Sequence, residues 1–342
     1  MVWAEQGGFC IDTALFVDRR STTLDLRYAF YLLQTLGLDE PSKDSAVPGL
    51  DRSDAHNKPI PSHSCTDQQA IAAFLDRETA RIDQLIAKKE RLVGLLIEKR
   101  KAAIKGLVFG QHLDLLMTPS GVQWIPDLTN GWVVQRLSRL FDFLDHIRVP
   151  LNSEERADLE KIYPYYGASG IIDKVDRYLF DEDLILVGED GANLVMQSTL
   201  VAFIATGKYW VNNHAHILRP RSGPLEFWVH VLNQVPYEIY VTGSAQPKLT
   251  AEALRSLPLP VPPLTVQYKL AEQIGTVSRM IDKLLSPIGA SIERLRELRS
   301  ALITAAVTGQ IDVATWGNRG ETDRRLDAIE LELATEPAGV TG

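Results

Sequence analysis

Two long stretches of the chain carry apolar residues at alternating spacings of three and four positions. In the second stretch only Ser291 interrupts the pattern, which occupies Leu270, Ile274, Val277, Ile281, Leu284, Ile288, Leu295, Leu298 and Leu302. The first stretch shows the same pattern with more breaks, at Ile71, Leu75, Ile82, Leu85, Leu92, Leu96 and Ala103. This periodicity is typical of a coiled-coil seam and predicts helices over about residues 67–105 and 266–307.

The two stretches belong to one internal repeat. Residues 66–111 correspond to residues 265–310 without a gap, at a constant offset of 199 positions, and the two copies end on Gly110-Gln111 and Gly309-Gln310. The register extends backwards to about residue 7. A chain built from two copies of one unit is expected to have two-fold character.

Long helices with an apolar stripe need a surface that covers the stripe, and the simplest one is the other copy. A two-fold arrangement favours an antiparallel coiled coil between the two helices. A dimerisation rod, in which each stripe pairs with another chain, remains the alternative. Gly94 is expected to weaken the first helix, and Pro287, close to Gly289, is expected to kink or interrupt the second.

The region between the helices predicts a mixed α/β domain. Short apolar runs at 184–187, 200–204 and 209–211 predict strands, and 225–232 predicts a helix. The predicted organisation is the end of a first such domain in 1–62, the first long helix with its linker in 63–115, a complete domain in 116–263, the second long helix in 264–310, and an acidic tail, expected to be disordered, in 311–342.

Composition narrows the class of protein. The net charge of −8 argues against a protein that coats nucleic acid by charge alone, but not against one whose partners supply positive charge. Cys10 and Cys65 are far apart in the sequence, which favours free thiols, a reducing cytoplasmic setting and no zinc site. Neither a membrane-spanning apolar run nor a signal-peptide pattern is present in the sequence.

Catalytic signatures do not occur. Gly207-Lys208 lacks the preceding glycine of a phosphate-binding loop and is followed by Tyr209. The sequence also lacks the dinucleotide-binding glycine pattern, a Gly-x-Ser-x-Gly elbow and an Asn-Pro-Pro-Tyr-type methyltransferase segment. His214 and His216 would share one face of a strand, but no third ligand stands at a suitable spacing, so no metal is expected. We therefore expect a non-catalytic chain.

Candidate nucleic-acid contacts lie in the loops of 116–263. Tyrosines offer stacking faces, asparagine and glutamine amides can read adenine, and lysines can meet phosphate. Each type has a simpler interpretation, because tyrosines beside glycine pack turns, asparagines form turns and lysines are commonly solvated. The candidates are Tyr165, Tyr166, Ser169, Lys174, Lys208, Asn212, Asn213, Gln246 and Lys248.

Several segments of the chain resemble the specificity subunit of type I restriction-modification systems. They are 67–83 and 98–100 in the first helix, 298–312 at the end of the second, and 165–170, 213–216 and 243–249 in the domain between them. Together they are spread over most of the chain, in the order found in that family. The resemblance implies an α/β (α+β) target recognition domain and two long helices that form an antiparallel coiled coil.

The resemblance also implies a division of labour. Each target recognition domain would read one half of a split site in double-stranded DNA, and the helices would space the domains and dock two methyltransferase subunits. The positions assigned to partner binding are Ile71, Leu75, Ile82, Leu85, Ile281, Leu284, Leu295 and Leu302. The partners would bring S-adenosylmethionine, and a motor-nuclease subunit would bring ATP and magnesium, so this chain is expected to bind no cofactor and no membrane.

The N-terminal part departs from the family pattern, because only about residues 7–62 match a recognition domain there. We expect this part to be poorly ordered and its apolar side chains to be poorly covered, namely Leu26, Tyr28, Phe30, Leu32 and Leu33. The chain would then need a second specificity chain to read a split site, or would act only as a coiled-coil scaffold. A DNA reader requires Lys208, Lys248 and the Tyr165 loop on one face, whereas a scaffold does not.

Overall fold

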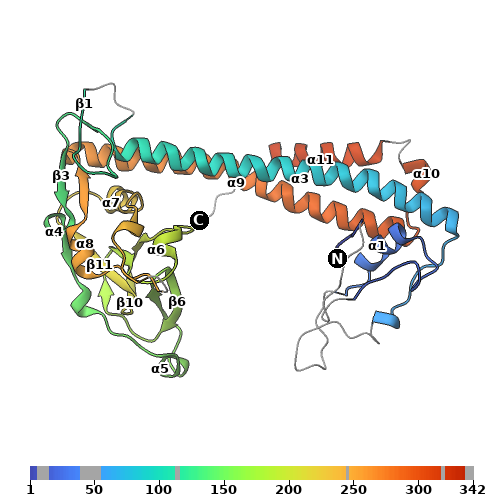
Figure 1. Ribbon diagram of the computed structural model, residues 1–342, viewed down its shortest axis with the longest axis horizontal. Coiled ribbons are helices and arrows are strands. Elements are labelled where there is room, and N and C mark those ends of the chain that lie inside the picture. The colour runs from blue at the N-terminus through green and yellow to red at the C-terminus, as the bar shows by residue number, and fades with distance from the viewer. Residues whose placement is uncertain (6–14, 39–54, 112–115, 244–245, 317–319, 336–342) are drawn as a thin grey trace. The chain divides into compact units, whose positions relative to one another are not determined.

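The computed structural model describes residues 1–5, 15–38, 55–111, 116–243, 246–316 and 320–335 (Figure 1). They fall into two units, with residues 1–96 and 282–342 in unit 1 and residues 97–281 in unit 2. Two helices of 44 residues each contribute to both units, α3 (Cys65–Val108) and α9 (Leu264–Val307). These bounds agree with the two helices predicted from the heptad pattern.

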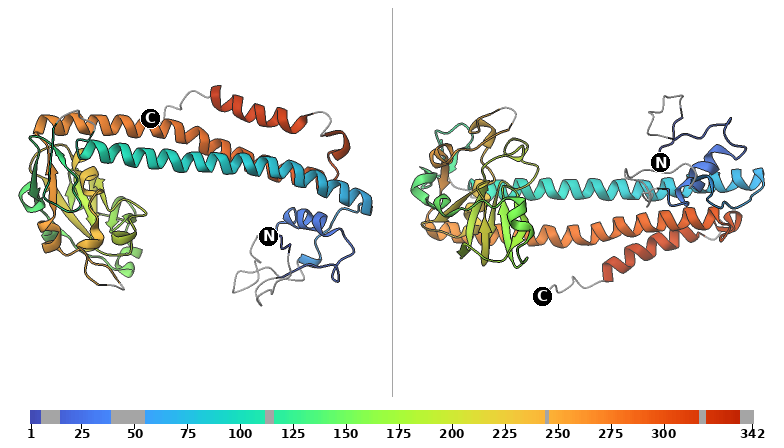
Figure 2. Two further views of the ribbon diagram at one scale, coloured as in Figure 1. Left: turned by 45° about the horizontal axis from the view of Figure 1, so that its top comes forward. Right: turned by 90° about the horizontal axis from the view of Figure 1, so that it is seen from below.

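The two long helices pack antiparallel, as the shared apolar stripe predicted (Figures 1 and 2). In unit 1 the Nε2 of His63, just before α3, lies 2.8 Å from the carbonyl oxygen of Val307 at the end of α9, and Asp83 pairs with Arg299 at 2.8 Å. In unit 2 the end of α3 and the start of α9 share one core that includes Ile104 and Leu270. In each unit, therefore, residues near the end of one helix meet residues near the start of the other.

Helix α9 continues through Pro287, so the predicted interruption is wrong. Proline removes one intrahelical hydrogen bond, but Ile281 and Ile292 on either side are buried and keep the helix against its partner. Packing of an apolar face supplies most of the stability of a long helix, which explains why one lost bond does not break it. No helix in the described ranges is apolar enough over its length to cross a membrane.

Both long helices end in the same way. Gly110 and Gly309 follow the last turn with φ values of +71° and +74°, which is the left-handed region that favours glycine. The next amide returns to the helix in both copies, from Gln111 to the carbonyl of Gly106 at 2.9 Å and from Gln310 to that of Ala305 at 2.8 Å. The internal repeat therefore extends from the sequence to the capping hydrogen bonds.

A buried glutamine near the start of each long helix shows where the two copies differ. The Nε2 of Gln68 donates to the carbonyl of His63, and that of Gln267 donates to the carbonyl of Pro262, both at 2.9 Å. In the first copy the Oε1 of Gln68 also accepts from the amide of Asp25 at 2.8 Å. The residue 199 positions after Asp25 is a proline, which has no amide hydrogen. The buried Oε1 of Gln267 accordingly has no hydrogen-bond partner.

Unit 1 adds short helices to its part of the α3–α9 pair. Helix α1 (Leu26–Gln34) and helix α11 (Glu321–Thr335) lie on opposite sides of the pair (Figures 1 and 2). The Tyr28 side chain is completely buried and Leu32 is 2% exposed, in one cluster with Leu75 and Leu302 of the long helices. The expectation of poor coverage is wrong for Tyr28 and Leu32, because the long helices cover them, whereas Leu26, Phe30 and Leu33 are half-buried.

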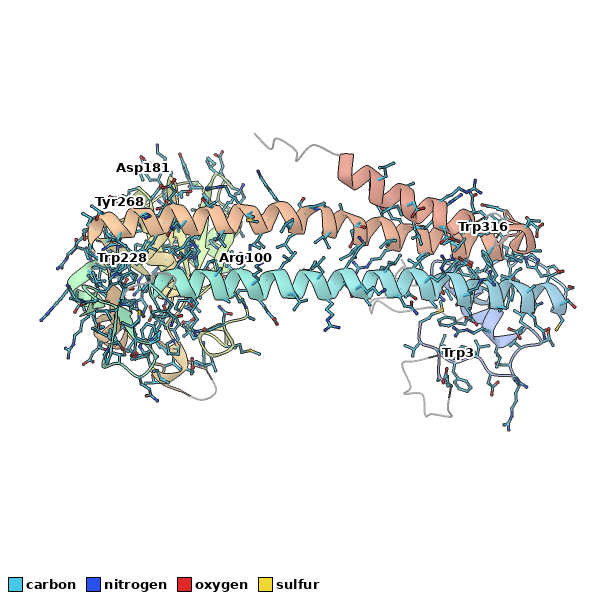
Figure 3. The ribbon with its side chains drawn as sticks, turned by 90° about the horizontal axis from the view of Figure 1, so that it is seen from above. Trp3, Arg100, Asp181, Trp228, Tyr268 and Trp316 are labelled. Carbon is cyan, nitrogen blue, oxygen red and sulfur yellow. The ribbon has the colours of Figure 1, made fainter. Side chains whose placement is uncertain are left out.

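Residues 313–316 and 321–335 are helical, although a disordered tail is expected for 311–342 from the sequence, and residues 317–319 and 336–342 lie outside the described ranges. Helix α10 (Val313–Trp316) is followed by α11, and Trp316 is labelled beside α9 in Figure 3. Trp316, Leu326 and Ile329 pack against the core of unit 1. Asp323 forms an ion pair with Arg81 of α3. Apolar side chains from both α10 and α11 thus anchor a segment whose acidic composition alone suggested disorder.

Unit 2 contains two four-stranded sheets. The first has the order β6 (Gly170–Val175), β5 (Tyr163–Gly167), β10 (Lys208–Val211), β7 (Phe180–Asp181), and β5 and β10 are parallel. The second is antiparallel, with the order β4 (Phe141–Phe143), β11 (Ala215–Pro220), β8 (Leu184–Gly188), β9 (Ala202–Ala205). The predicted strands at 184–187 and 209–211 are confirmed, and the one at 200–204 is shifted by one to two residues.

The remaining elements of unit 2 link these sheets to the long helices. Two short ladders join β1 (Met117–Thr118) to β2 (Leu128–Thr129) and β3 (Val133–Arg136) to β12 (Pro258–Val261). The helical segments are α4 (Leu137–Leu140), η1 (Asp145–Ile147), α5 (Ser153–Ala157), α6 (Asn193–Met196), α7 (Leu225–Leu232), η2 (Tyr237–Ile239) and α8 (Ala251–Ser256). The predicted helix 225–232 is α7.

The main core of unit 2 joins the second sheet to the ends of the long helices. Every residue of β8 is buried, as expected for a short apolar strand covered on both faces. Trp228 of α7 is fully buried and meets Phe141 of β4 edge to face, with ring centroids 5.3 Å apart. Leu107 of α3 and Ile274 of α9 belong to the same core. The part of the helical pair within unit 2 therefore packs against the second sheet.

Candidate nucleic-acid interface

Four segments of unit 2 meet where β5, β8 and β10 end, and we call them the loop cluster. They are the Ala168-Ser169 turn, Glu189–Gly191, Asn212–His214, and residues 242–243 with 246–249. Backbone hydrogen bonds join the last three, because the amide of Glu189 donates to the carbonyl of His214 at 2.9 Å and the amide of Leu249 donates to the carbonyl of Glu189 at 2.8 Å. Residues far apart in the sequence thus form one surface.

The Ala168-Ser169 turn is held close to the end of β8. A Cβ atom on Gly188 would lie 2.8 Å from the carbonyl oxygen of Ala168, so any larger residue there would push the turn away. The turn itself closes the β5–β6 hairpin, in which Gly167 pairs with Gly170. The glycines that marked this stretch as a turn in the sequence therefore set the position of Ser169.

Charged side chains form a network beneath the loop cluster, and we call it the charge network. Its members are Asp145, Arg148, Glu189, His216 and Lys248. Glu189 is its centre, because its carboxylate lies 2.6 Å from Arg148 Nη1 and 3.1 Å from Lys248 Nζ. Arg148 Nη1 also donates to the carbonyl of Ala215 at 2.9 Å. The network ties strand β11, the segment after β8 and the segment before α8 to one another.

His216 joins the network with both ring nitrogens. The ring is 1% exposed, with Nδ1 2.6 Å from Asp145 Oδ2 and Nε2 2.9 Å from the carbonyl oxygen of Leu249. His216 therefore links the η1 helix to the loop before α8.

The two acids of the network titrate at lower pH than usual. Burial alone would raise the pKa of Asp145, but hydrogen bonds from His216 and the amide of Ile217, with the nearby positive charges, outweigh it and lower that pKa. Burial likewise opposes ionisation of Glu189, and Arg148 and Lys248 hold its pKa below the usual range. Both side chains are therefore carboxylates at neutral pH, and each positive charge of the network has an acid beside it.

Four of the residues selected from the sequence lie exposed in the loop cluster. They are Ser169, Asn213, Gln246 and Lys248. Their hydroxyl, amide and ammonium groups can form hydrogen bonds with base edges and phosphates. The Lys248 ammonium already faces Glu189, so it is a cation held in place by the protein rather than a freely solvated one. The cluster can therefore present polar side chains from three different segments to one ligand.

Asn212 lies at the edge of the cluster but is 4% exposed, so its assignment as a base reader is corrected. Its Oδ1 accepts the amide hydrogen of His214 at 2.8 Å, which is the local turn bond that asparagine commonly makes. Asn212 therefore shapes the segment that presents Asn213, and only Asn213 remains available to a ligand.

The two tyrosines belong to the core of unit 2, so their assignment to stacking on nucleic acid is also corrected. Tyr165 is 1% exposed, its hydroxyl bonds both backbone groups of Leu151, and the Arg156 guanidinium lies 4.8 Å from the centre of its ring. Tyr166 is partly buried and packs on Phe203 with ring centroids 5.9 Å apart. Tyr165 and Tyr166 pack in two different apolar clusters, so both rings lie inside the unit, although the sequence around them predicts a loop.

Lys174 and Lys208 lie at the other end of the first sheet, so their assignment to the same DNA-binding face is corrected. The expectation that a DNA reader carries Lys208, Lys248 and the Tyr165 loop on one face is therefore not met. Lys208 begins β10, whose last residue precedes the cluster, and Lys174 pairs with Pro164 near the start of β5. The Lys208 ammonium lies 3.8 Å from an Asp181 carboxylate oxygen and 4.8 Å above the Tyr178 ring. The sequence did not show that strands of four to six residues separate these lysines from Ser169 and Lys248.

Sequence reasoning missed most of the charge network. The one signal was the His214-x-His216 pair, but its two rings face acids, with His214 Nδ1 2.7 Å from Asp190 and His216 beside Asp145. Within the described ranges no group of three or more histidine, cysteine, aspartate or glutamate residues could hold a metal ion. Asp145 and Arg148 stand about 70 residues before His216, so only the fold brings these groups together.

The helical positions assigned to partner binding are mostly inside unit 1 or unit 2. Six of them are 5% exposed or less, namely Ile71, Leu75, Ile82, Ile281, Leu295 and Leu302, and this part of the assignment is corrected. The side chains that form the seam cover each other and are not free for an external protein. Leu85 is half-buried, and Leu284 is 44% exposed. Any external partner of the helices must therefore use positions outside the seam.

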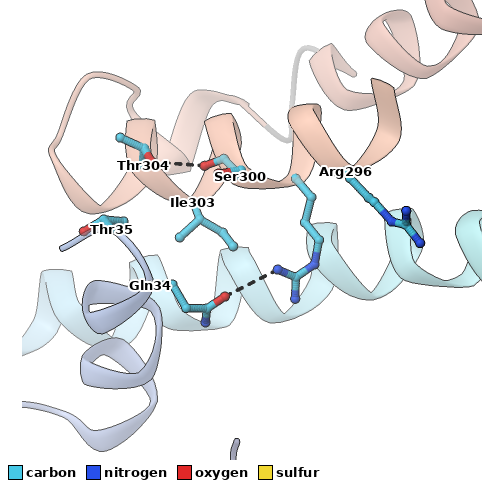
Figure 4. Close-up of a pocket in the computed structure, with 7 residues that line it drawn as sticks. Gln34, Thr35, Arg296, Ser300, Ile303 and Thr304 are labelled. Carbon is cyan, nitrogen blue, oxygen red and sulfur yellow. Dashed lines mark hydrogen bonds between the residues drawn. The ribbon is translucent and has the colours of Figure 1, made fainter. Parts of the chain in front are cut away.

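A pocket of about 240 Å³ lies between the end of α1 and the last turns of α9 in unit 1 (Figure 4). Its arginines are engaged, because Arg299 pairs with Asp83 at 2.8 Å and Arg296 lies 2.8 Å from Glu90. Arg299 also reaches Gln34 of α1 at 3.4 Å. The pocket is therefore a gap at the junction between α1 and the long helices, and it lacks the features of a ligand site.

Comparison with known proteins identifies the domain that carries the loop cluster. A family profile described as the type I restriction modification DNA specificity domain matches residues 129–294. This range includes every segment of the loop cluster and of the charge network. It also includes residues 264–294 of α9, so the matched range covers part of the long helix as well as the sheets.

Two curated proteins give the scale of the similarity. A putative type I restriction enzyme specificity subunit of Haemophilus influenzae, S.HindORF215P, is 29% identical over 169 residues, which span 49% of this chain and 40% of that protein. The StySPI specificity subunit of Salmonella potsdam is 22% identical over 288 residues, spanning 77% of this chain and 59% of that protein. This chain thus matches about half the length of these relatives.

A solved structure supports the fold. It is described as the structural basis of complex assembly and conformational transition of the type I restriction-modification system. The alignment has a TM-score of 0.54 at 16% identity and covers 84% of this chain and 72% of that one. At this identity the likeness concerns the arrangement of sheets and long helices only.

Proposed function

Because the chain belongs to the specificity subunits of type I restriction-modification systems, we propose that unit 2 reads one half of a split DNA target through the loop cluster. The chain would act without catalysing a reaction itself. It would present its recognition domain to DNA and hold methyltransferase subunits on the long helices. S-adenosylmethionine would come with those subunits, and ATP and magnesium with a motor-nuclease subunit.

This proposal rests on the way separate segments come together in the loop cluster. Within the DNA specificity domain, three separate segments bring Ser169, Asn213 and Gln246 to one exposed surface beside Lys248. Sequence is read by polar side chains at base edges, and an asparagine or glutamine amide can form two hydrogen bonds with adenine. We assign base reading to Asn213 and Gln246, and a phosphate contact to Lys248.

The charge network gives these assignments a physical basis. A loop that reads bases must hold its side chains in place before DNA arrives, because ordering them on binding costs affinity. Glu189, Arg148 and His216 join three segments beneath the cluster through hydrogen bonds of 2.6 to 2.9 Å. The network therefore supports preformed readers better than mobile ones.

Four alanine variants, measured by DNA binding of the co-purified complex, test the assignment. Asn213→Ala and Gln246→Ala should cost about 1–3 kcal/mol on the cognate site and little on other sequences. Lys248→Ala should weaken binding to all sequences and reduce the salt dependence by about one phosphate contact. Lys208→Ala removes the same charge at the far end of the sheet and should leave both quantities unchanged.

The result that would contradict the proposal is an equal loss in all four variants, or a loss confined to Lys208→Ala.

A methylation map of DNA modified by the complex adds an independent measurement. A split site with one half that depends on Asn213 and Gln246 would support half-site reading by unit 2. A symmetric site would indicate that two copies of the chain each supply one half, and an absence of methylation would favour a scaffold role.

A further inference from the structure

Two isoleucines lie exposed near the tip of the β5–β6 hairpin, close to the turn that carries Ser169. Ile171 is 57% exposed and Ile172 is 55% exposed, and their strand β6 forms one edge of the first sheet. Apolar side chains on an edge strand favour unwanted association between molecules, which is a cost unless they serve a contact. Within the described residues neither isoleucine belongs to an apolar cluster of unit 2, so packing of the core does not account for them.

A β-bulge in this hairpin places the two side chains on opposite faces of the first sheet. Ile171 pairs with Tyr166, and the register then skips Ile172. A Cβ atom on Gly167 would lie 3.1 Å from Cγ2 of Ile172, so this side chain lies over Gly167. Successive residues of a strand face opposite ways. Ile172 therefore lies on the face of Gly167, and Ile171 lies on the face of Tyr166.

Ile172 is thereby placed beside the segment that carries a base reader. The position of the same Cβ atom above Gly167 is 3.5 Å from Nδ2 of Asn212. The Ile172 side chain and the Asn212 amide therefore lie on either side of this point, and Asn213 follows Asn212 directly. Glycine keeps the space open, because a larger residue at position 167 would crowd the isoleucine.

An apolar group beside an amide reader matches the chemistry of an A·T base pair. In the major groove adenine presents N7 and its N6 amino group to an amide, and the paired thymine presents O4 and a C5 methyl group. The major groove also admits a two-stranded β-ribbon, which is the form of the β5–β6 hairpin. Isoleucine is branched at Cβ and restricted at χ1, so ordering it against a methyl group costs little conformational entropy.

We propose that Ile172 reads thymine in the half-site by packing on its C5 methyl group, next to the adenine contact of Asn213. The inference rests on the proposed function and adds an apolar reader to the polar ones. Thymine is present in any half-site that an adenine reader recognises, because it pairs with that adenine. Ile171, on the other face of the hairpin, takes no part in this contact.

Replacement of thymine by deoxyuridine tests this inference, because uracil pairs with adenine in the same way but lacks the C5 methyl group. Binding of the co-purified complex is measured on duplexes that carry the mapped target, with its thymines replaced one at a time. At one position the replacement should weaken binding about fourfold, which corresponds to the burial of one methyl group. Ile172→Ala should abolish this difference between thymine and uracil, and Ile172→Val should retain it.

Ile171→Ala is the matched control, because it removes the same side chain at nearly the same exposure on the opposite face of the hairpin. It should leave the preference for thymine over uracil unchanged. Circular dichroism should show that all three variants fold. A preference that is lost in Ile171→Ala would overturn the assignment to Ile172.

The inference also fails if uracil weakens binding at no position, or if the preference for thymine survives Ile172→Ala. A loss of affinity that is equal on thymine and uracil duplexes is of the second kind, and it would assign Ile172 to folding or to association between complexes. Asn213→Ala separates this failure from that of the proposed function. If Asn213→Ala still changes sequence preference, the loop cluster reads DNA and only the thymine contact is wrong. If neither Asn213→Ala nor Ile172→Ala changes it, the proposed function fails as well.

Discussion

The two buried glutamines offer a paired measurement of hydrogen bonding at the starts of the long helices. We consider replacement of each by methionine, which has a similar length and no hydrogen-bonding amide. Gln68 donates to the His63 carbonyl and accepts from the Asp25 amide, whereas Gln267 only donates, to the Pro262 carbonyl. The same substitution therefore removes two bonds in the first copy and one in the second.

The expected free energies follow from which groups lose a partner. Gln68→Met leaves the Asp25 amide and the His63 carbonyl unpaired, and at about 1 kcal/mol for each partly exposed group it should destabilise by about 2 kcal/mol. Gln267→Met leaves one carbonyl unpaired but also removes the buried Oε1 that has no partner, and the two effects of about 1 kcal/mol are opposite in sign. We therefore expect a change near zero.

Urea unfolding followed by circular dichroism gives the change in stability, and hydrogen exchange shows where it occurs. Gln68→Met should lower the unfolding midpoint and speed exchange of the Asp25 amide, which loses its acceptor. Gln267→Met should shift the midpoint little. Equal destabilisation by the two substitutions would refute the reasoning, because it would mean that the unpaired Oε1 of Gln267 carries no penalty.

Three further predictions use positions where the repeat or the burial provides a control. Gly110→Ala should destabilise the protein more than Gly309→Ala. Both substitutions cost about 1–2 kcal/mol for a left-handed residue, but the atom nearest to the new Cβ is 2.4 Å away at Gly110 and 3.6 Å away at Gly309. Thermal unfolding measures the difference, and equal losses would contradict the prediction. Ile281→Asp should unfold the helical pair by burying an unpaired charge, whereas Leu284→Asp, at a 44% exposed position, should change the unfolding free energy by less than about 1 kcal/mol. The pKa values of Asp145 and Glu189 are lowered in the folded state, so their contribution to stability is present above the unfolded pKa of about 4 and is lost as pH falls through the folded pKa. Glu189→Gln should therefore reduce the loss of unfolding free energy on acidification. An unchanged dependence of stability on acidic pH would count against the network.

The sequence was sufficient to predict the long helices because their signal is redundant. Heptad spacing and the 199-residue repeat independently indicate α3 and α9, and a single contrary residue such as Pro287 cannot outweigh a buried stripe on both sides of it. The same reasoning failed for α11, where charge composition suggested disorder. The tail is ordered because Trp316 and Leu326 pack on a surface that exists only when the two long helices are packed together.

The candidate site was predictable only in part, for a geometric reason. The loops could be recognised from their glycines and polar residues, and Ser169, Asn213 and Lys248 do lie in one cluster. Inward or outward orientation within a short strand depends on pairing register, which one sequence does not reveal, so the sequence pattern wrongly predicts Tyr165 at the surface. The separation of Lys208 from the cluster likewise depends on the order of strands in the sheet.

The charge network indicates how this domain could be specific in a chain of net charge −8. Burying several charges costs free energy that their mutual attraction barely offsets, so such a network is a poor device for stability or for attracting DNA. Its positive groups are matched by carboxylates, and Lys248 faces Glu189 at 3.1 Å. What the network does supply is a fixed position for each segment that carries a reader. Affinity for phosphates can then come from partner subunits, and this chain contributes the part of binding that depends on base sequence. On this view, breaking the network at His216 should reduce discrimination between sequences more than it reduces total affinity.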